Sequence, residues 1–369
     1  MPSTFRVFAT CDIGESLEIL HRKGYEVEIY PEPHAPPKSL IVEKVRSGID
    51  GLISSLRDKI DGEVFEAGKG TLKVVAQYAV GTDNINRAEA NRYKIPYTNT
   101  PDVLTEATAE YAFFVMGALA RKLWSAEKML RDNQWNSWHP SLPFLGHELT
   151  GKIIAIIGTG RIGRAMIKKC VGFDMNILCY NTGRENPEFA SAMQEIMDLR
   201  HKHGLTREKQ WIQYVNLEDA LREADFVSLH VPLLREGESA SPTYHMFNEK
   251  TLRLMKPSAM IINTARGPVI DEVTLAHALK ENWIAGAALD VYATEPLPSD
   301  SPLRDPAIED RCRLYPHHGS ATYETRLSTD PDRGMAGRSI QGLMDVLEKN
   351  YGGDLTKMPF VVNKEAFTK

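Results

Sequence analysis

Short apolar runs alternate with longer amphipathic stretches along most of the chain. The runs are rich in Val, Ile, Leu and Phe and predict strands, whereas the stretches between them carry apolar residues at helical spacing. Parallel strands need a crossover connection, which a helix usually supplies, so this order predicts open α/β sheets. The expected strands lie at residues 5–10, 25–30, 50–56, 72–81, 95–101, 151–158, 176–181, 225–232, 259–265, 286–292 and 313–318.

The expected strands fall into two series, which predicts two α/β domains in a chain of 369 residues. The second series opens at residues 151–158 with a continuous apolar run, as expected where helices cover both faces of a parallel sheet. Between the series, a long apolar helix begins near Thr105. The irregular, Trp-rich segment 131–149 follows it, and we interpret this segment as a connection or an arm. An amphipathic helix at 338–350 could pack back on the first domain.

Composition and charge narrow the class of protein. Apolar residues make up 42% and charged residues 25% of the chain, which excludes a disordered or coiled-coil protein. The net charge is −5, whereas a nucleic-acid-binding protein usually carries a clustered excess of basic residues. Four scattered cysteines without a C-x-x-C pair indicate neither a disulfide framework nor a zinc site. Without a recognisable signal peptide or an apolar run of about 18 residues, we expect a soluble cytoplasmic protein with no membrane partner.

Residues 184–214 form a long charged insertion whose pattern is helical. We expect a solvated helix on the surface, because charged and polar residues dominate this segment. His201 and His203 belong to that polar face in this interpretation rather than to a metal site, and we expect no bound metal.

A glycine-rich turn follows the strand predicted at 151–158. Gly158, Gly160 and Gly163 have the G-x-G-x-x-G spacing, and a helix is predicted directly after them. In such a turn the first glycine permits the tight bend, the second lets a pyrophosphate approach the backbone, and the third lets the helix pack on the strand. The helix N-terminus then faces the phosphates, and Arg161 adds a cation. The turn therefore predicts a dinucleotide site.

The end of the strand at 176–181 bears on the choice of coenzyme. A site selective for NAD usually has Asp or Glu at this position, where the carboxylate binds the ribose hydroxyls. This chain has Asn181, Thr182 and Arg184 instead, which avoid repelling a 2′-phosphate and can donate to it, so we expect NADP in preference to NAD. In the alternative, Arg184 points into solvent and Glu185 binds the ribose.

Polar residues follow three later strands of the second series. Arg266 directly follows the strand at 259–265, Asp290 and Glu295 lie at and just beyond the carboxyl end of the next strand, and His317 lies at the carboxyl end of the last. Open α/β sheets bind ligands at the carboxyl ends of their strands. Reduction of a 2-oxo acid needs a cation for the carboxylate and ketone oxygen, which the planar fork of Arg supplies, and an acid for the new alkoxide. A His paired with a carboxylate supplies that acid, because the negative charge favours the imidazolium.

The chain resembles the D-2-hydroxyacid dehydrogenases over nearly its whole length. The segments that carry the resemblance are VVAQYAVGTDN, NTPDVLTEATAEYA, GTGRIG, NTARGPVID, AALDVYATEP and PHHGSAT. The resemblance implies that Arg266, Glu295 and His317 form the catalytic set, with His318 only a neighbour. It also implies a flavodoxin-like substrate domain at 1–121, completed by 322–369, and a Rossmann-type NAD(P)-binding domain at 122–321.

The resemblance implies further binding residues. The backbone N–H groups of Val80 and Gly81 would hold the substrate carboxylate, and Leu56, Ser320 and Arg266 would line the substrate. The residues implied at the coenzyme, in addition to the glycine turn and the end of its neighbouring strand, are Thr108, Ile162, Val231, Pro232, Thr243, Thr264, Ala265, Arg266, Asp290, His317 and Gly319.

Within this family the chain is most similar to glyoxylate/hydroxypyruvate reductases. Residues 135–140 resemble their W-x-S-W-x-P segment, which implies a homodimer in which Trp138 reaches the partner's active site. Two positions depart from the pattern: Asn181 replaces an acidic residue, and Arg57 stands where Ser or Thr is common. Leu56 still suits a small C2–C3 acid.

Three other interpretations remain open. Another member of the family could act on phosphoglycerate, 2-ketogluconate or a similar sugar acid, although no basic cluster for a phosphorylated substrate is apparent. Formate dehydrogenase is disfavoured, because it has Gln where this chain has Glu295. A transcriptional corepressor that uses the fold as a dinucleotide sensor would keep the same residues but turn over 2-oxo acids only feebly.

Overall fold

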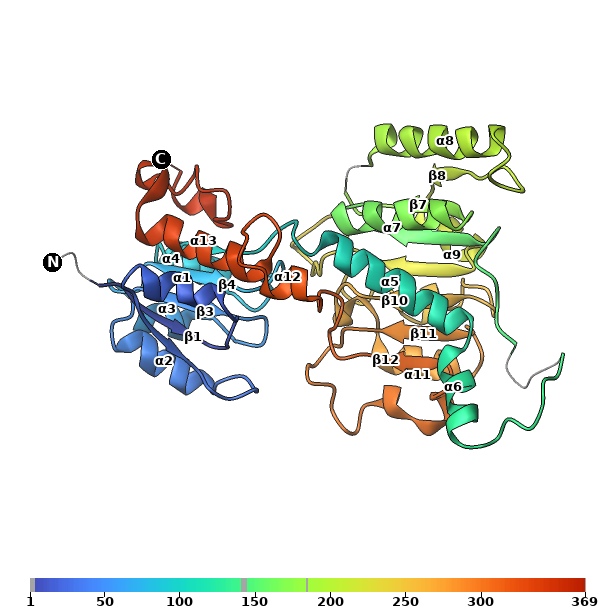
Figure 1. Cartoon of the computed structure of the whole chain (residues 1–369), viewed down its shortest axis with the longest axis horizontal. Coiled ribbons are helices and arrows are strands. Elements are labelled where there is room, and N and C mark those ends of the chain that lie inside the picture. The colour runs from blue at the N-terminus through green and yellow to red at the C-terminus, as the bar shows by residue number, and fades with distance from the viewer. Residues whose placement is uncertain (1–3, 141–144, 184, 369) are drawn as a thin grey trace. The chain divides into compact units, whose positions relative to one another are not determined.

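Each of the two expected series of strands forms its own parallel sheet (Figure 1). The computed structural model describes residues 4–140, 145–183 and 185–368. Unit one consists of the residues up to Leu104 together with those from Ser320 onward, and unit two runs from Thr105 to Gly319. The two-domain α/β fold predicted from the sequence is confirmed.

The sheet of unit one has the strand order β2-β1-β3-β4-β5, and all of its strand pairs are parallel. This is the flavodoxin-like order, with its switch point between β1 and β3. The strands are β1 (Arg6–Ala9), β2 (Glu26–Ile29), β3 (Gly51–Ser54), β4 (Val74–Gln77) and β5 (Tyr97–Thr98). The helices are α1 (Ser16–Arg22), α2 (Lys38–Arg46), α3 (Gly62–Ala67), α4 (Arg87–Arg92), α12 (Tyr323–Leu327) and α13 (Met335–Leu347), with short 3-10 helices at Asn350–Gly353 and Lys364–Ala366.

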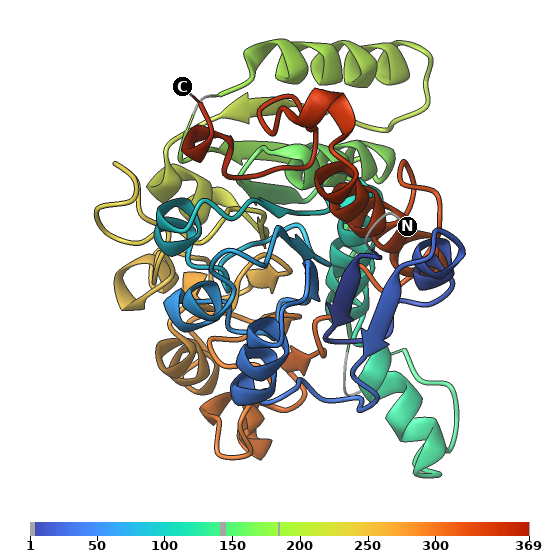
Figure 2. The same cartoon turned by 90° about the vertical axis from the view of Figure 1, so that its left-hand side faces the viewer.

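Alternate residues of these strands fill two cores, one on each face of the sheet. Phe8, Leu52 and Val75 pack with residues of α2, α3 and α4, whereas Val7 and Ile53 pack with residues of α1 and α13. Helices α1 and α13 come from opposite ends of the chain and lie side by side (Figures 1 and 2). The C-terminal helix therefore completes the core of unit one.

The sheet of unit two has the order β12-β11-β10-β9-β6-β7-β8, again with parallel pairs throughout, and its switch point lies between β6 and β9. The strands are β6 (Ile153–Ile157), β7 (Asn176–Tyr180), β8 (Ile212–Tyr214), β9 (Phe226–Leu229), β10 (Met260–Asn263), β11 (Gly286–Leu289) and β12 (Cys312–Leu314). The helices are α5 (Thr105–Ala120), α6 (Leu123–Arg131), α7 (Arg161–Gly172), α8 (Pro187–Lys202), α9 (Leu217–Glu223), α10 (Glu249–Leu252) and α11 (Glu272–Lys280), with 3-10 helices at Gly267–Val269, Pro302–Arg304 and Pro306–Ile308.

Strand β6 shows why the expected run was continuously apolar. Ile154 and Ile156 pack with residues of α5 and α7, whereas Ala155 and Ile157 pack with residues of α9 and α11 on the other face. All four side chains are fully buried. Helices on both faces thus remove the alternation of apolar and polar residues that a half-exposed strand would show.

The boundary between the units differs from the expected one. We expected the first domain to run to residue 121, but the structure assigns α5 to unit two, so the boundary falls between Leu104 and Thr105. The physical reason is packing, because Ala109, Ala112 and Met116 of α5 are buried in the core that α7 and β6 share. At the other end the chain returns to unit one at Ser320, close to the expected residue 322.

The insertion at 184–214 also differs in part from expectation. Its helix is present as α8, but the segment ends in β8, which adds an edge strand beside β7 (Figure 1). Ile212 pairs with Ile177 and Tyr214 with Cys179. A strand this short leaves no periodic pattern to detect in a sequence.

The described residues contain neither a helix long and apolar enough to cross a membrane nor a cluster of His, Cys, Asp and Glu that could hold a metal ion.

Candidate active site

The glycine-rich turn joins β6 to α7 and is shaped by two close approaches of the backbone. Gly158 has φ of +100°, and a Cβ there would lie 2.7 Å from the carbonyl oxygen of His230. A Cβ at Gly163 would lie 2.0 Å from the carbonyl oxygen of Gly158. Both positions therefore require glycine, for the bend and for the contact of helix with strand.

Gly160 differs from the other two glycines of the turn. A Cβ at this position would meet no described atom within 4 Å, so the turn leaves open space in front of the N-terminus of α7. The first N–H groups of a helix have no partner within the helix and carry a partial positive charge. The turn therefore presents space and donors suited to a pyrophosphate.

Glu295 and His317 are brought together from the loops that follow β11 and β12. The Nδ1 atom of His317 lies 2.7 Å from Oε2 of Glu295, and both side chains are partly exposed. Glu295 Oε1 also accepts a hydrogen bond from the N–H of Tyr292 at 3.0 Å. Of the two adjacent histidines, His317 therefore pairs with Glu295. The backbone N–H of the other, His318, donates to Asp290 at 2.6 Å.

The electrostatics of this pair favour the ion pair. Burial opposes ionisation of Glu295, but the hydrogen bond and charge of His317 outweigh burial and hold the pKa of the Glu295 carboxyl below its usual range. Burial raises the pKa of the Asp290 carboxyl, although the N–H groups of His318 and Gly319 donate to its two oxygens.

Arg266 follows β10 and faces the same group of loops. Its charge contributes to the lowered pKa of Glu295. The next residue, Gly267, has no space for a side chain, because a Cβ would lie 1.9 Å from the carbonyl carbon of Tyr292. The backbone after Arg266 therefore packs directly against the loop that carries Glu295.

Comparisons with known proteins identify the family of this chain. Residues 113–319 match the family described as D-isomer specific 2-hydroxyacid dehydrogenase, NAD binding domain. The chain belongs to the D-2-hydroxyacid dehydrogenase family. It is an NAD(P)-dependent dehydrogenase, and the family resemblance noted from the sequence is confirmed.

Relatives of the dehydrogenase match it over almost its whole length. The glyoxylate reductase of Thermococcus litoralis is 41% identical, with 98% of each chain covered. A crystal structure of a Thermus thermophilus protein has a TM-score of 0.80 and 34% identity, covering 97% of this chain and all of its own. The structure of a glyoxylate reductase from Paecilomyes thermophila has a TM-score of 0.74 and 27% identity, covering 95% of this chain and 97% of its own.

Several side chains expected at the coenzyme of the dehydrogenase do lie near one another. Gly319 lies beside both Thr108 and Asp290. Val231 lies against Gly158 of the turn.

Three further residues expected at the coenzyme are Pro232, Thr243 and Thr264. The Thr243 hydroxyl donates to the carbonyl of Pro232 at 2.6 Å. The Oγ1 atom of Thr264 is buried without a partner among the described residues, which fits a ligand group beside it. These residues fit a nicotinamide dinucleotide, which would supply the hydride for reduction when bound.

The residues expected at the adenosine ribose follow β7. Asn181 and Thr182 are partly exposed at the end of this strand, whereas Arg184 lies outside the described residues. In the turn, Arg161 is exposed and Ile162 packs against the apolar core of unit two. Ala265 accepts a hydrogen bond from the Arg266 guanidinium at 2.7 Å.

The residues expected at the substrate, apart from Arg266 and Trp138, belong to unit one. The carbonyls of Val80 and Gly81 accept hydrogen bonds from Asn99 at 2.8 Å and Gln77 at 3.2 Å. Neither N–H of this pair has an acceptor among the described residues. Leu56 is 39% exposed.

Ser320 and Arg57 are also in unit one. Ser320 Oγ accepts from Arg326 at 3.2 Å. Arg57 donates to the carbonyl of Pro33 at 2.7 Å, so its guanidinium turns from β3 toward the loop after β2.

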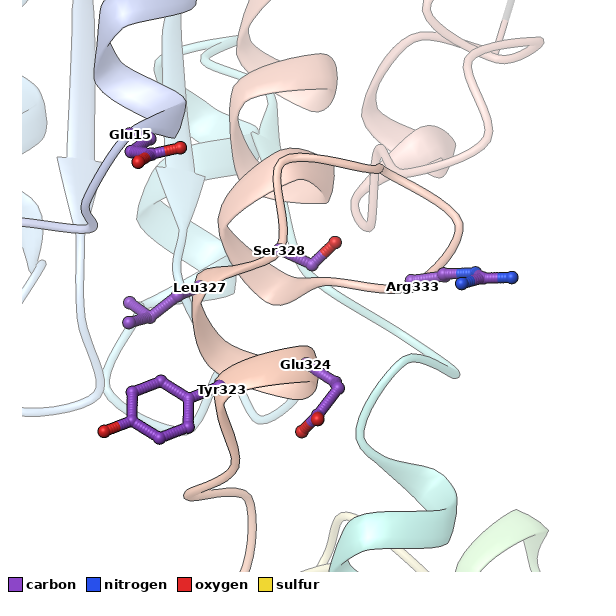
Figure 3. A pocket seen from close by; sticks show the side chains of 6 residues that line it. All are labelled: Glu15, Tyr323, Glu324, Leu327, Ser328 and Arg333. Atoms are coloured by element: carbon purple, nitrogen blue, oxygen red, sulfur yellow. The ribbon is translucent and has the colours of Figure 1, made fainter.

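A surface hollow of about 500 Å³ in unit one contains none of the expected site residues. It is lined by Glu15, Tyr323, Glu324, Leu327, Ser328 and Arg333, which come from the start of α1, from α12 and from the loop that follows (Figure 3).

One residue at the site was not anticipated from the sequence. Glu272 at the start of α11 accepts a hydrogen bond from the N–H of Ala293 at 2.6 Å, within the loop that carries Glu295. A carboxylate in the first turn of a helix is common and favoured by the helix dipole, so its position in the sequence gave no signal of a further role.

Proposed function

We propose that the dehydrogenase reduces small 2-oxo acids, glyoxylate to glycolate and hydroxypyruvate to D-glycerate, and prefers NADPH. The Glu295–His317 pair at 2.7 Å carries this proposal, because it places an imidazole that can donate a proton beside a carboxylate that orients it. Its relatives named glyoxylate reductase support the choice of substrate.

In this proposal His317 protonates the ketone oxygen as the hydride from the coenzyme reaches the ketone carbon. Its Nδ1 faces Glu295, so Nε2 carries the transferred proton. Arg266 polarises the ketone and binds the carboxylate through its planar fork. Within unit one, the adjacent N–H groups of Val80 and Gly81 have no acceptor among the described residues, and two such donors suit an anion such as a carboxylate.

A panel of 2-oxo acids tests the substrate. Glyoxylate and hydroxypyruvate should exceed 2-ketogluconate in kcat/KM by about tenfold or more, since an apolar Leu56 at the substrate, as the family resemblance implies, suits an acid of two or three carbons. A sugar acid that ranks first would favour another member of the family. Only feeble turnover of every acid would favour a dinucleotide-sensing scaffold.

The coenzyme preference should be at least about tenfold in kcat/KM for NADPH over NADH at low salt. A carboxylate at position 181 would oppose the 2′-phosphate by roughly 4 kcal/mol at 4 Å and an effective dielectric constant of 20. Solvent and salt reduce this to about 1–2 kcal/mol. Asn181 avoids the repulsion, and Thr182 and Arg184 supply donors.

The double variant Asn181→Asp, Arg184→Ala should reverse this preference. The kcat value with saturating coenzyme should stay close to that of the wild type, because neither position touches the reacting atoms in this proposal. An NADH preference in the wild-type enzyme would instead assign the ribose contact to Glu185.

We further propose a homodimer in which Trp138 lines the partner's substrate site. Trp138 is 77% exposed, which argues against a role in packing its own segment. Large apolar side chains are exposed along α5, α6 and the segment that follows, an unusual concentration for a monomer surface. They are Phe114, Leu123, Trp124, Leu130, Trp135, Trp138 and Leu145.

Trp138→Ala should therefore widen the substrate range toward bulkier 2-oxo acids while changing Tm little. Trp135→Ala is the matched control, since Trp135 is 51% exposed on the same segment and should leave the substrate ranking unchanged. A large fall in Tm with an unchanged ranking for Trp138→Ala would assign the side chain to packing. Light scattering of the wild-type protein tests the dimer itself.

A further inference from the structure

Two carboxylates hold the loop that carries Glu295. The N–H of Tyr292 donates to Glu295 at 3.0 Å, and the next N–H along the chain, that of Ala293, donates to Glu272 at 2.6 Å. Successive N–H groups of one loop therefore bind two carboxylates, and the charge of Glu295 acts on Glu272. Glu272 comes from a different element, the start of α11.

Glu272 is not needed to cap its own helix. Asp271 is the N-cap of α11, and its Oδ1 accepts hydrogen bonds from the N–H groups of Val273 at 3.1 Å and Thr274 at 3.2 Å. The side chain of Glu272 instead leaves the helix and bonds to the loop after β11. This geometry points to a role outside α11.

The segment from Arg266 to Glu272 touches this loop at both of its ends. At the first end, Gly267 packs against the backbone of Tyr292 without space for a Cβ. At the second end, Glu272 bonds to Ala293. The position of Arg266 relative to Glu295 therefore depends on the two contacts together.

The charges around Glu272 connect it to the catalytic pair. Burial raises the pKa of the Glu272 carboxyl, and the negative charges of Glu295 and Asp271 raise it further. The hydrogen bond from the Ala293 N–H and the charge of His245 lower this pKa. Among the described residues, the charge of Arg266 acts on Glu295, Tyr292 interacts with Glu295, and Asp290 interacts with His317. Glu272 thus adds a negative charge to a site that needs a protonated His317.

We propose that Glu272 is a positioning residue of the reduction, which holds the Glu295 loop through Ala293 and favours the protonated imidazole of His317 through its charge. This inference rests on the proposed function, in which His317 is the acid.

Two variants of the full-length enzyme separate the contact from the charge. Glu272→Gln keeps an oxygen that can accept from Ala293 but removes the charge, whereas Glu272→Asp keeps the charge but shortens the reach. Glu281→Gln is the control, because it removes one charge at the opposite end of α11. The kcat/KM for glyoxylate with NADPH is measured from about pH 5 to about pH 10 for each protein.

For Glu272→Gln, the alkaline decline in kcat/KM should move to lower pH by roughly half a unit, a loss of about threefold where the wild-type rate is already falling. Glu272→Asp should keep the wild-type pH profile but lower kcat/KM severalfold at every pH. The control should match the wild type in both respects. A Glu272→Gln profile that overlays the wild type, or that the control reproduces, would overturn the proposal.

A second measurement does not depend on the substrate. The imidazole of His317 is followed by NMR in protein with labelled histidine and assigned with His317→Gln. The His317 ring should lose its proton at lower pH in Glu272→Gln than in the wild type. An unchanged titration rejects the role of Glu272 even if glyoxylate is the wrong substrate, whereas a shifted titration without turnover of glyoxylate rejects only the proposed function.

Discussion

Replacing Arg266 with lysine should lower kcat/KM for glyoxylate reduction by about 100- to 1,000-fold, the loss typical when one oriented donor to a developing oxyanion is removed. Lysine keeps the positive charge, but its ammonium cannot present two parallel N–H groups to a carboxylate. The structure holds Arg266 from two sides. Its Nη1 donates to the carbonyl of Ala265 at 2.7 Å, and Asn263 donates to the Arg266 carbonyl at 2.9 Å.

Steady-state kinetics with NADPH and glyoxylate measure this loss. Arg222→Lys is the matched control, because Arg222 pairs with Glu218 at 3.5 Å on an exposed part of α9 and should tolerate the change. Near-normal kinetics for Arg266→Lys would remove Arg266 from the proposed reaction.

Replacing Glu295 with glutamine should move the alkaline decline of the reduction rate to lower pH by about 1–2 units. Reduction needs the imidazolium of His317, so the rate falls as pH rises and that proton is lost. The carboxylate of Glu295 stabilises the imidazolium at 2.7 Å, and glutamine removes this charge while keeping the size of the side chain. At neutral pH the variant should therefore be slower by about tenfold or more.

The sign of this effect follows from the lowered pKa of Glu295. Between that pKa and the loss of the proton from His317, both groups are charged and the pair is intact. Below this window Glu295 becomes protonated, and above it His317 becomes neutral, so the pair is lost at either limit. The variant has no such window, because glutamine does not ionise.

The adjacent histidines provide the control for this experiment. His317→Gln should abolish the alkaline decline together with most of the activity, whereas His318→Gln should keep the wild-type profile. If Glu295→Gln and the wild type have superimposable pH–rate profiles, the pairing of Glu295 with His317 has no catalytic role.

The expected strands match the observed ones where the hydrophobic signal is local. The run at 151–158 predicted β6 because both of its faces are covered, and the alternation of strands and helices predicted parallel sheets. Strand β8 was missed, because three residues at a sheet edge are stabilised by backbone pairing with β7 rather than by an apolar pattern of their own.

The domain boundary shows a different limit of the sequence. Helix α5 follows the first series of strands along the chain, so proximity in sequence favoured the first unit. Its buried face belongs to the core of the second unit instead. A helix buried in one core or the other has the same apolar pattern, and only its tertiary contacts distinguish the two.

For the site, the amino-acid sequence by itself determined the residue types and their placement at strand ends: a glycine turn after β6, and Arg266, Glu295 and His317 after later strands. Spacing carries this information because the carboxyl ends of parallel strands meet at one edge of a sheet. The family resemblance already implied that Glu295 acts with His317 rather than His318, and the structure has this contact at 2.7 Å. The tertiary structure alone decided that Gly267 packs against Tyr292 and that Glu272 bonds to Ala293. Each of these contacts joins loops that are distant along the chain, and its geometry depends on how the intervening strands and helices pack, which local sequence does not encode.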